Sequence, residues 1–143
     1  MIIRYQQVDN FIIENSIIVN IGCGQEGLFL KRHRYKIKNS YGFDFKINDL
    51  LMDNLVFINN SPIGEFLLDK ESVDTIFMNA LLKHLDNPEN VLLKALDILK
   101  INGKIIMTTL TAFSIFRQNV YKIFLFNCLM SKIILNTIII FNI

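Results

Sequence analysis

The chain has 143 residues, which is enough for one domain with a substantial core. Hydrophobic residues make up 52% and charged residues 20%, a composition that excludes an intrinsically disordered chain. The net charge is +2, but residues 1–111 carry 12 basic and 13 acidic residues, and this near-neutral balance argues against a dedicated nucleic-acid binder.

The first predicted strand leads into a turn that contains two glycines. Ile17–Ile21 is a short, mostly β-branched apolar run, so it is read as a buried strand rather than a helix. Gly22 and Gly24 follow it, and because glycine has no Cβ the backbone there can turn sharply and approach a ligand closely. A helix is expected to begin near Gln25 and to continue through Lys31.

A strongly basic segment, residues 31–38, follows the start of this helix. It holds five Lys or Arg residues in eight positions. The simpler interpretation is a solvated helix end and loop. The sharper interpretation is a rim that contacts an anionic substrate or RNA.

The second predicted strand, residues 41–44, ends in a carboxylate. Asp44 lies 22 residues after Gly22. At the end of a strand, such a carboxylate can accept hydrogen bonds from both hydroxyls of a ribose. A glycine turn and a carboxylate at the carboxyl ends of two adjacent parallel strands form the pattern of a site for a nucleotide-type ligand.

Strands and helices continue to alternate up to residue 109. A polar helix or loop is expected around residues 48–54, and loop residues at 59–64. The expected strands cover residues 55–58, 72–78 and 104–109, with a helix between the last two. This alternation predicts an α/β fold with a doubly wound, mostly parallel sheet of about five strands.

The helix that begins near residue 88 has the clearest signals in the chain. Asn87 is a good N-cap, Pro88 suits the first helical position and Glu89 complements the helix dipole. We expect Lys100 in its last turn and Asn102-Gly103 at its end. Five apolar side chains fall on one face at helical spacing: Val91, Leu92, Ala95, Leu96 and Leu99.

The two cysteines, Cys23 and Cys128, are too few for a disulfide framework and have no metal-type spacing, so no metal site is expected. Cys23 lies inside the glycine turn, where we expect a small buried thiol rather than a reactive nucleophile. The N-terminus lacks a charged start followed by an apolar run of signal-peptide length, so a cytoplasmic location is the default expectation.

The composition changes at about residue 112. Residues 112–143 carry Arg117, Lys122, Lys132 and no acid, and Ile, Leu and Phe dominate most of this segment. We therefore divide the chain into a core, residues 1–111, and a hydrophobic basic tail, residues 112–143.

Four interpretations of the tail are left open. The loss of acids and the gain of Ile, Phe, Lys and Asn fit a truncated or frame-shifted product of an AT-rich gene. Val120–Ile143 has 24 residues, long enough to span a bilayer, although Lys122 and Lys132 oppose insertion. An ordered core or edge element and a poorly folded tail are the other two interpretations.

Four segments, in the right order, resemble motifs of the class I S-adenosylmethionine-dependent methyltransferases, which have a Rossmann-like fold. Asn20-Ile21-Gly22-Cys23-Gly24 resembles the first motif, and residues 69–76 are similar to the segment that enters the fourth strand. Residues 82–89 resemble the "EHL.DP" motif, and residues 99–106 resemble the "LKPGG" turn. The likeness covers roughly residues 17–111, so the chain is expected to lack that family's final strands.

The resemblance implies S-adenosylmethionine as the cofactor and methyl transfer to a small-molecule acceptor as the reaction. Asp44 would bind the ribose, and Asn60 and Ser61 sit where the family contacts the adenine. The glycine turn would face the methionine part of the cofactor, through Asn20, Gly22, Cys23 and Gly24.

On the acceptor side, the resemblance implies that Met78 and Asn79, after the fourth strand, line the methyl-transfer face. His84 is the candidate general base, since a histidine near neutral pH could take the proton of a hydroxyl or amine acceptor. The alternative for His84 is a structural histidine at a helix entry, bonded to backbone.

The chain departs from the family pattern at several positions. Asn20 replaces the acid common at the end of the first strand, so a charge-assisted contact with the cationic cofactor is lost, a loss of roughly 1–3 kcal/mol. The third glycine, Gly27, comes one position later than usual. Lys83 replaces the acid before His84, and Asn102 replaces the usual proline.

Two other functions are left open. Gly22–Gly27 also satisfies the GxGxxG pattern with Asp44 at the right distance, so an NAD-binding oxidoreductase domain is a rival. The second alternative is an inactive cofactor-binding remnant or a partner's subunit. An unfinished sheet would also expose an edge beside the strand at 104–109, through which a homodimer could form.

Overall fold

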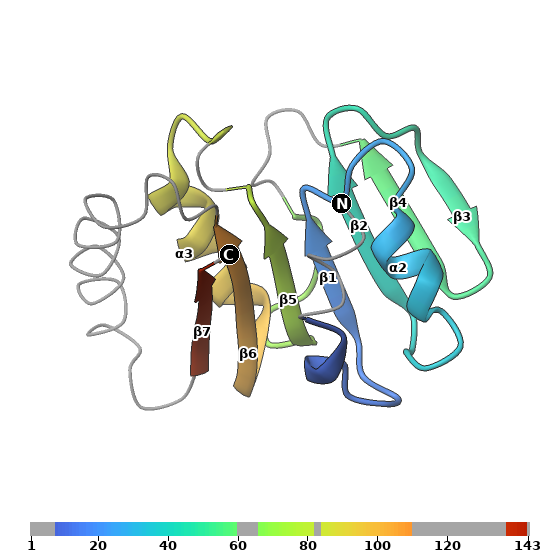
Figure 1. Ribbon diagram of the computed structural model, residues 1–143, viewed down its shortest axis with the longest axis horizontal. Coiled ribbons are helices and arrows are strands. Elements are labelled where there is room, and N and C mark those ends of the chain that lie inside the picture. The colour runs from blue at the N-terminus through green and yellow to red at the C-terminus, as the bar shows by residue number, and fades with distance from the viewer. Residues whose placement is uncertain (1–7, 60–65, 82–83, 110–136, 143) are drawn as a thin grey trace.

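A computed structural model describes residues 8–59, 66–81, 84–109 and 137–142. Its centre is one sheet with the strand order β3-β4-β2-β1-β5-β6-β7 (Figure 1). Neighbouring strands are parallel except for the antiparallel pair β3 and β4. The elements are η1 (Asp9–Phe11), β1 (Ile18–Ile21), α2 (Leu28–His33), β2 (Ser40–Asp44), β3 (Leu50–Met52), β4 (Leu55–Asn59), β5 (Val73–Asn79), α3 (Pro88–Ile98), β6 (Leu99–Thr109) and β7 (Thr137–Asn142).

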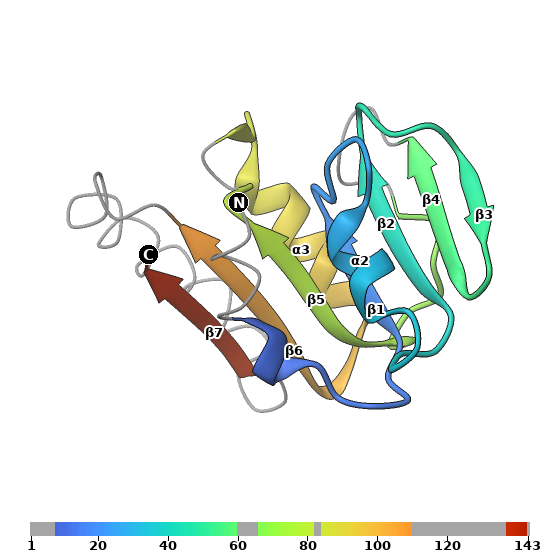
Figure 2. The same cartoon turned by 45° about the vertical axis from the view of Figure 1, so that its right-hand side comes forward.

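Helices α2 and α3 cover opposite faces of the sheet, as a doubly wound fold requires (Figure 2). Successive side chains of a strand point to opposite faces, so β1 supplies both layers. Val19 and Ile21 pack in a cluster with α3, whereas Ile18 packs in a second cluster with Phe29 and Leu30 of α2. The predicted α/β class with a mostly parallel, Rossmann-like sheet is therefore confirmed.

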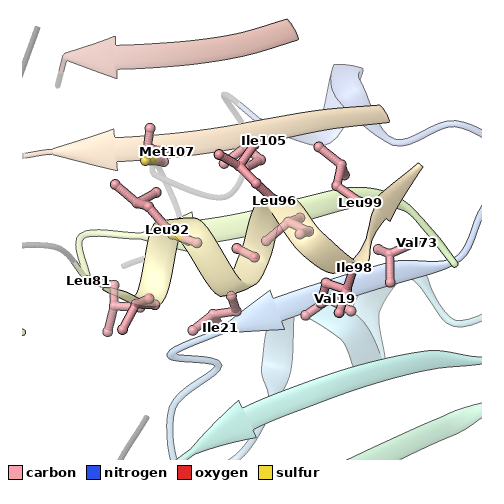
Figure 3. Close-up of a cluster of buried hydrophobic side chains, with 14 of the residues drawn as sticks. Val19, Ile21, Val73, Leu81, Leu92, Leu96, Ile98, Leu99, Ile105 and Met107 are labelled. Carbon is pink, nitrogen blue, oxygen red and sulfur yellow. The ribbon is translucent and has the colours of Figure 1, made fainter. Parts of the chain in front are cut away.

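The cluster on the α3 side is the larger part of the core in the described residues. Leu92 and Leu96 of α3 lie over β5 and β6, with Ile105 and Met107 of β6 beneath them (Figure 3). Their exposed fractions are at most 3%. Fully burying such a side chain contributes about 1.5–3 kcal/mol, so the amphipathic face found in the sequence is what fixes α3 on the sheet.

Helix α3 begins as predicted but ends earlier. The Asn87 side chain accepts a hydrogen bond from the Asn90 N–H at 3.1 Å, and Pro88 is the first helical residue. The expected end at residues 102–103 is wrong, because Leu99 already pairs with Val73 of β5. Lys100 consequently lies in β6, where its Nζ donates to Asp74 Oδ1 at 2.8 Å. Pairing with β5 has therefore overridden the helical periodicity at Leu99.

Segment 48–54, expected as a polar helix or loop, contains the short strand β3. Leu50 lies opposite Phe57 and Met52 lies opposite Leu55 in an antiparallel hairpin. Asp53, at the hairpin turn, has a φ of 51°, a left-handed conformation that Asp tolerates better than most residues. Three residues are too few for an alternating pattern to be recognised, which is why the strand was missed.

The last described segment, β7, pairs in parallel with β6 from Lys104–Thr137 to Thr109–Asn142. We expected the edge of β6 to be unpaired and available to a second chain. In the structure, β7 of the same chain pairs with that edge. This agrees with the interpretation of the tail's end as an ordered edge element. Most of the membrane span considered at residues 120–143 lies outside the described residues. Among the residues that are described, no helix is long and apolar enough to cross a membrane.

The basic segment 31–38 lies at the amino end of the sheet. Lys36 O accepts a hydrogen bond from Asn15 N, and Lys38 N donates to Ser16 O, both at 2.8 Å, just before β1 begins. Arg32 pairs with Asp9 at 3.0 Å. This end is opposite the glycine turn, which counts against contact with a substrate bound at that turn, and the interpretation as an RNA-binding rim stays a prediction.

Candidate functional site

The glycine turn and Asp44 lie together at the carboxyl ends of two neighbouring strands. Asn20 of β1 is in register with Gly42 of β2, which brings the two strand ends level. Phe43 O accepts hydrogen bonds from Gly22 N at 2.7 Å and Cys23 N at 3.1 Å. In the sheet, β2 lies on one side of β1 and β5 lies on the other, so the strand order reverses at β1. The turn after β1 is therefore at the topological switch point, where open α/β sheets bind ligands.

Asp44 is tied directly to the turn. Its Oδ2 accepts a hydrogen bond from Gly24 N at 2.8 Å, and its Oδ1 accepts one from Lys46 N at 2.8 Å. The residue is 7% exposed. Each carboxylate oxygen has a second lone pair, so both can still accept a hydrogen bond from a ligand hydroxyl. The Asp44 carboxylate is thus already oriented by two backbone hydrogen bonds and lies beside the backbone of Gly24, which has no side chain.

The first two glycines have different surroundings. Both have positive φ angles, 73° at Gly22 and 75° at Gly24, which side-chain-bearing residues rarely adopt. A Cβ on Gly22 would lie 2.8 Å from Leu81 Cδ1, whereas a Cβ on Gly24 would meet nothing within 4 Å. The open side of the turn is therefore at Gly24, next to Asp44.

The third glycine has a packing role that sequence reasoning missed. A Cβ on Gly27, where φ is 58°, would lie 2.2 Å from Phe57 Cε1, and a Cβ on Gly42 would lie 2.6 Å from Phe57 Cδ1. The Phe57 ring thus crosses both glycines, one before α2 and one inside β2. A glycine inside a strand often marks such a close approach, so Gly42 was the available signal.

Cys23 is a buried thiol, 4% exposed, as the sequence analysis expected. Burial, together with the nearby Asp44 carboxylate, raises its pKa to about 12. Its Sγ donates to Gly24 O at 3.6 Å. A thiol that stays protonated at neutral pH is a poor nucleophile.

Neutral polar side chains follow the same edge of the sheet across β1, β5 and β6. Asn20 is 1% exposed, and its Oδ1 has no hydrogen-bond partner among the described residues. The same holds for Asn79 Nδ2, although Asn79 Oδ1 lies 3.4 Å from Thr108 Oγ1. Buried polar atoms are nearly always paired in folded proteins, so these two unpaired amide atoms indicate a place for ligand atoms.

The end of β5 is distorted beside this edge. Ala80 has a φ of 52°, and its N–H donates to Thr108 O at 2.9 Å and Oγ1 at 3.1 Å. Backbone strain of this kind is found more often at functional sites. Met78, in contrast, is fully buried in the core cluster with α3, so its side chain packs rather than lining an accessible surface.

His84 and the two expected adenine contacts are the remaining predicted site residues. His84 is exposed, and the hydrogen bond it makes is from its backbone N–H to Leu81 O at 2.8 Å. Its role as a general base stays a prediction. Asn60, Ser61 and Lys83 lie outside the described residues.

Comparison with protein families gives one match. Residues 19–107 match the model of the methyltransferase domain, which is more than half of the chain. No curated protein matches the sequence.

Solved structures share the fold. A SAM-dependent methyltransferase from Aquifex aeolicus is 19% identical with a TM-score of 0.55, covering 70% of this chain and 60% of its own. Haemonchus contortus phosphoethanolamine N-methyltransferase 1, solved with phosphoethanolamine and S-adenosylhomocysteine, is 21% identical with a TM-score of 0.59, covering 71% and 24%. The [4+2]-cyclase SpnF is 15% identical with a TM-score of 0.59, covering 69% and 41%. The chain thus spans between a quarter and three fifths of these proteins, and the cyclase illustrates that one fold carries different reactions.

Proposed function

Because the chain belongs to the methyltransferase domain family, we propose that it binds S-adenosylmethionine and transfers the methyl group to a small-molecule acceptor. The observation that carries the proposal is the buried Asp44 carboxylate, hydrogen-bonded to Gly24 at the carboxyl ends of β1 and β2. A carboxylate in this place suits the two hydroxyls of a ribose.

Features of the described residues support a ligand of this class. Gly22 and Gly24 leave main chain without side chains at the switch point, and Gly24 has open space where a Cβ would be. The unpaired amide atoms of Asn20 and Asn79 suit the polar aminoacyl part of such a ligand. We assign the ribose to Asp44 and the methionine part to the glycine turn with Asn20 and Cys23.

When bound, S-adenosylmethionine supplies an electrophilic methyl group on a sulfonium, so the reactivity belongs to the cofactor. The chain's own contribution is alignment and exclusion of water. Asp44 orients the ribose, and the turn holds the aminoacyl part. His84, exposed after β5, would accept the proton of a hydroxyl or amine acceptor, with Asn79 at the end of β5 beside the transfer.

Isothermal titration calorimetry of the full chain with S-adenosylmethionine tests the proposal. Asp44→Asn keeps the shape and one acceptor oxygen but removes the charge, and we expect roughly tenfold weaker binding. Asp53→Asn removes an exposed carboxylate at the β3–β4 turn and serves as the matched control. Equal affinity of the Asp44→Asn variant would reject the ribose assignment, and binding of NAD in place of S-adenosylmethionine would favour the oxidoreductase alternative.

A further inference from the structure

The position of Asn20 in the site is defined by its neighbours in the sheet. Asn20 lies in β1 two residues before Gly22, in register with Gly42 on one side and Phe77 on the other. It is 1% exposed and its Oδ1 has no partner among the described residues. The side chain is neutral in either orientation of its amide. A neutral group therefore occupies the most deeply buried polar position beside the glycine turn.

Few charges lie close to Asn20 along this edge. Burial keeps the Cys23 thiol protonated at neutral pH, because its pKa is raised to about 12. Asn79 and Thr108, on the neighbouring strands, are neutral. Glu26 in the turn and Asp86 after β5 are exposed, and solvent screens exposed charges. Asp44 is thus the one buried carboxylate among the described residues at this edge, and both of its oxygens already accept backbone hydrogen bonds.

We propose that Asn20 determines how strongly the site distinguishes a cationic ligand from a neutral one, and that it makes this distinction small. The inference rests on the proposed function. S-adenosylmethionine and S-adenosylhomocysteine share the adenosine, the ammonium and the carboxylate, and they differ by the methyl group and the positive charge on sulfur. Negative charge in the site is the strongest source of an attraction that separates them, and a buried amide supplies only a dipole.

The physical reason is the weak screening of buried charges. An interaction between two charges is several times stronger in a protein interior than in bulk water. A carboxylate at position 20 would therefore add a strong attraction to a positively charged ligand, whereas the dipole of an amide adds a much weaker one. The chain is consequently expected to hold the neutral thioether about as tightly as the sulfonium.

Calorimetry of the full chain with each ligand tests this inference. For the wild type we expect dissociation constants for S-adenosylmethionine and S-adenosylhomocysteine that agree within roughly threefold. In Asn20→Asp we expect the ratio to shift toward S-adenosylmethionine by roughly tenfold. Asn39→Asp makes the same substitution at an exposed position just before β2, at the opposite end of the sheet, and we expect its ratio to equal that of the wild type.

The outcomes separate the two proposals. If both ligands bind and Asn20→Asp leaves the ratio unchanged, the inference about Asn20 is overturned while the proposed function stands. A wild type that prefers S-adenosylmethionine by more than about thirtyfold overturns it as well, and this result needs no variant to fold. If neither ligand binds the wild type, the proposed function fails and the inference fails with it.

Discussion

Asp44 and Gly24 are joined by a hydrogen bond of 2.8 Å between the carboxylate Oδ2 and the backbone N–H. This bond links the end of β2 to the turn after β1, so the geometry of the turn depends on a side chain from the next strand. The second oxygen of Asp44 accepts the Lys46 N–H at 2.8 Å, which also fixes the chain that leaves β2. One carboxylate thus organises both loops of the candidate site before any ligand is present.

Asp44→Ala should lower the stability of the protein. The change leaves two backbone N–H groups without their acceptor, and hydrogen bonds to a charged group contribute about 1.5–3 kcal/mol each. Because water can reach part of the opened site, we expect a loss of about 2–4 kcal/mol in the free energy of unfolding. Urea unfolding measures it. A loss no larger than that of the exposed-site variant Asp53→Asn would contradict the linking role.

Gly27→Ala should be far more destabilising than Gly24→Ala. Both glycines have positive φ, so both substitutions carry the strain of a left-handed residue, about 1–2 kcal/mol. At Gly27 the new Cβ also meets the Phe57 ring at 2.2 Å, whereas at Gly24 it meets open space. We expect an additional 1–3 kcal/mol at Gly27, roughly the effect of overpacking a core.

A double substitution identifies the cause of this difference. Phe57→Leu shortens the side chain that meets the new Cβ, so the Gly27→Ala, Phe57→Leu pair should lose less free energy than the sum of the two single changes. Unfolding in guanidinium chloride gives the coupling free energy. Simple additivity would show that the ring is not what excludes a side chain at position 27.

Stability should fall as the pH is lowered below about 6.5, in part because of His33. Burial lowers the pKa of His33, although Asp9, which lies 2.9 Å from its Nε2, opposes the shift; Arg32 and Lys36 also lower it. The folded state therefore binds fewer protons than the unfolded state just below the unfolded pKa of about 6.5, and its stability decreases with falling pH.

Unfolding at pH 7.5 and 5.5 measures this effect. The decrease in the free energy of unfolding should be smaller in His33→Gln than in the wild type. The chain has one other histidine, the exposed His84, and His84→Gln should keep the full decrease. The same decrease in the wild type and in His33→Gln would assign the pH dependence to other groups.

Asn87→Ala should destabilise α3. The Asn87 side chain accepts the Asn90 N–H at 3.1 Å, which satisfies one of the unpaired donors of the first turn. Loss of an N-cap lowers stability by about 1 kcal/mol. Thermal unfolding of Asn87→Ala, with Asn87→Asp as the control that keeps the acceptor, measures it. A reduced stability in both variants would point away from the capping bond.

Local chemistry explains which elements could be predicted. The start of α3 was predicted correctly because an N-cap, a proline and an acid act within one helical turn. Its end was not, because Leu99 satisfies helical periodicity and yet pairs with Val73. Strand β7 could not be predicted either, since its pairing with β6 joins segments separated by about 30 residues and leaves no local signal.

The sequence alone determined that a glycine turn and a carboxylate meet at adjacent strand ends. The reason is that both strands are parallel and joined by a helix, so their carboxyl ends must lie on one edge of the sheet. Only the tertiary structure decided that Phe57 crosses Gly27 and Gly42, that Asp44 bonds Gly24, and that Asn20 Oδ1 has no partner within the described part of the chain. These features depend on which side chains meet after distant strands have paired, and no spacing along the chain encodes that.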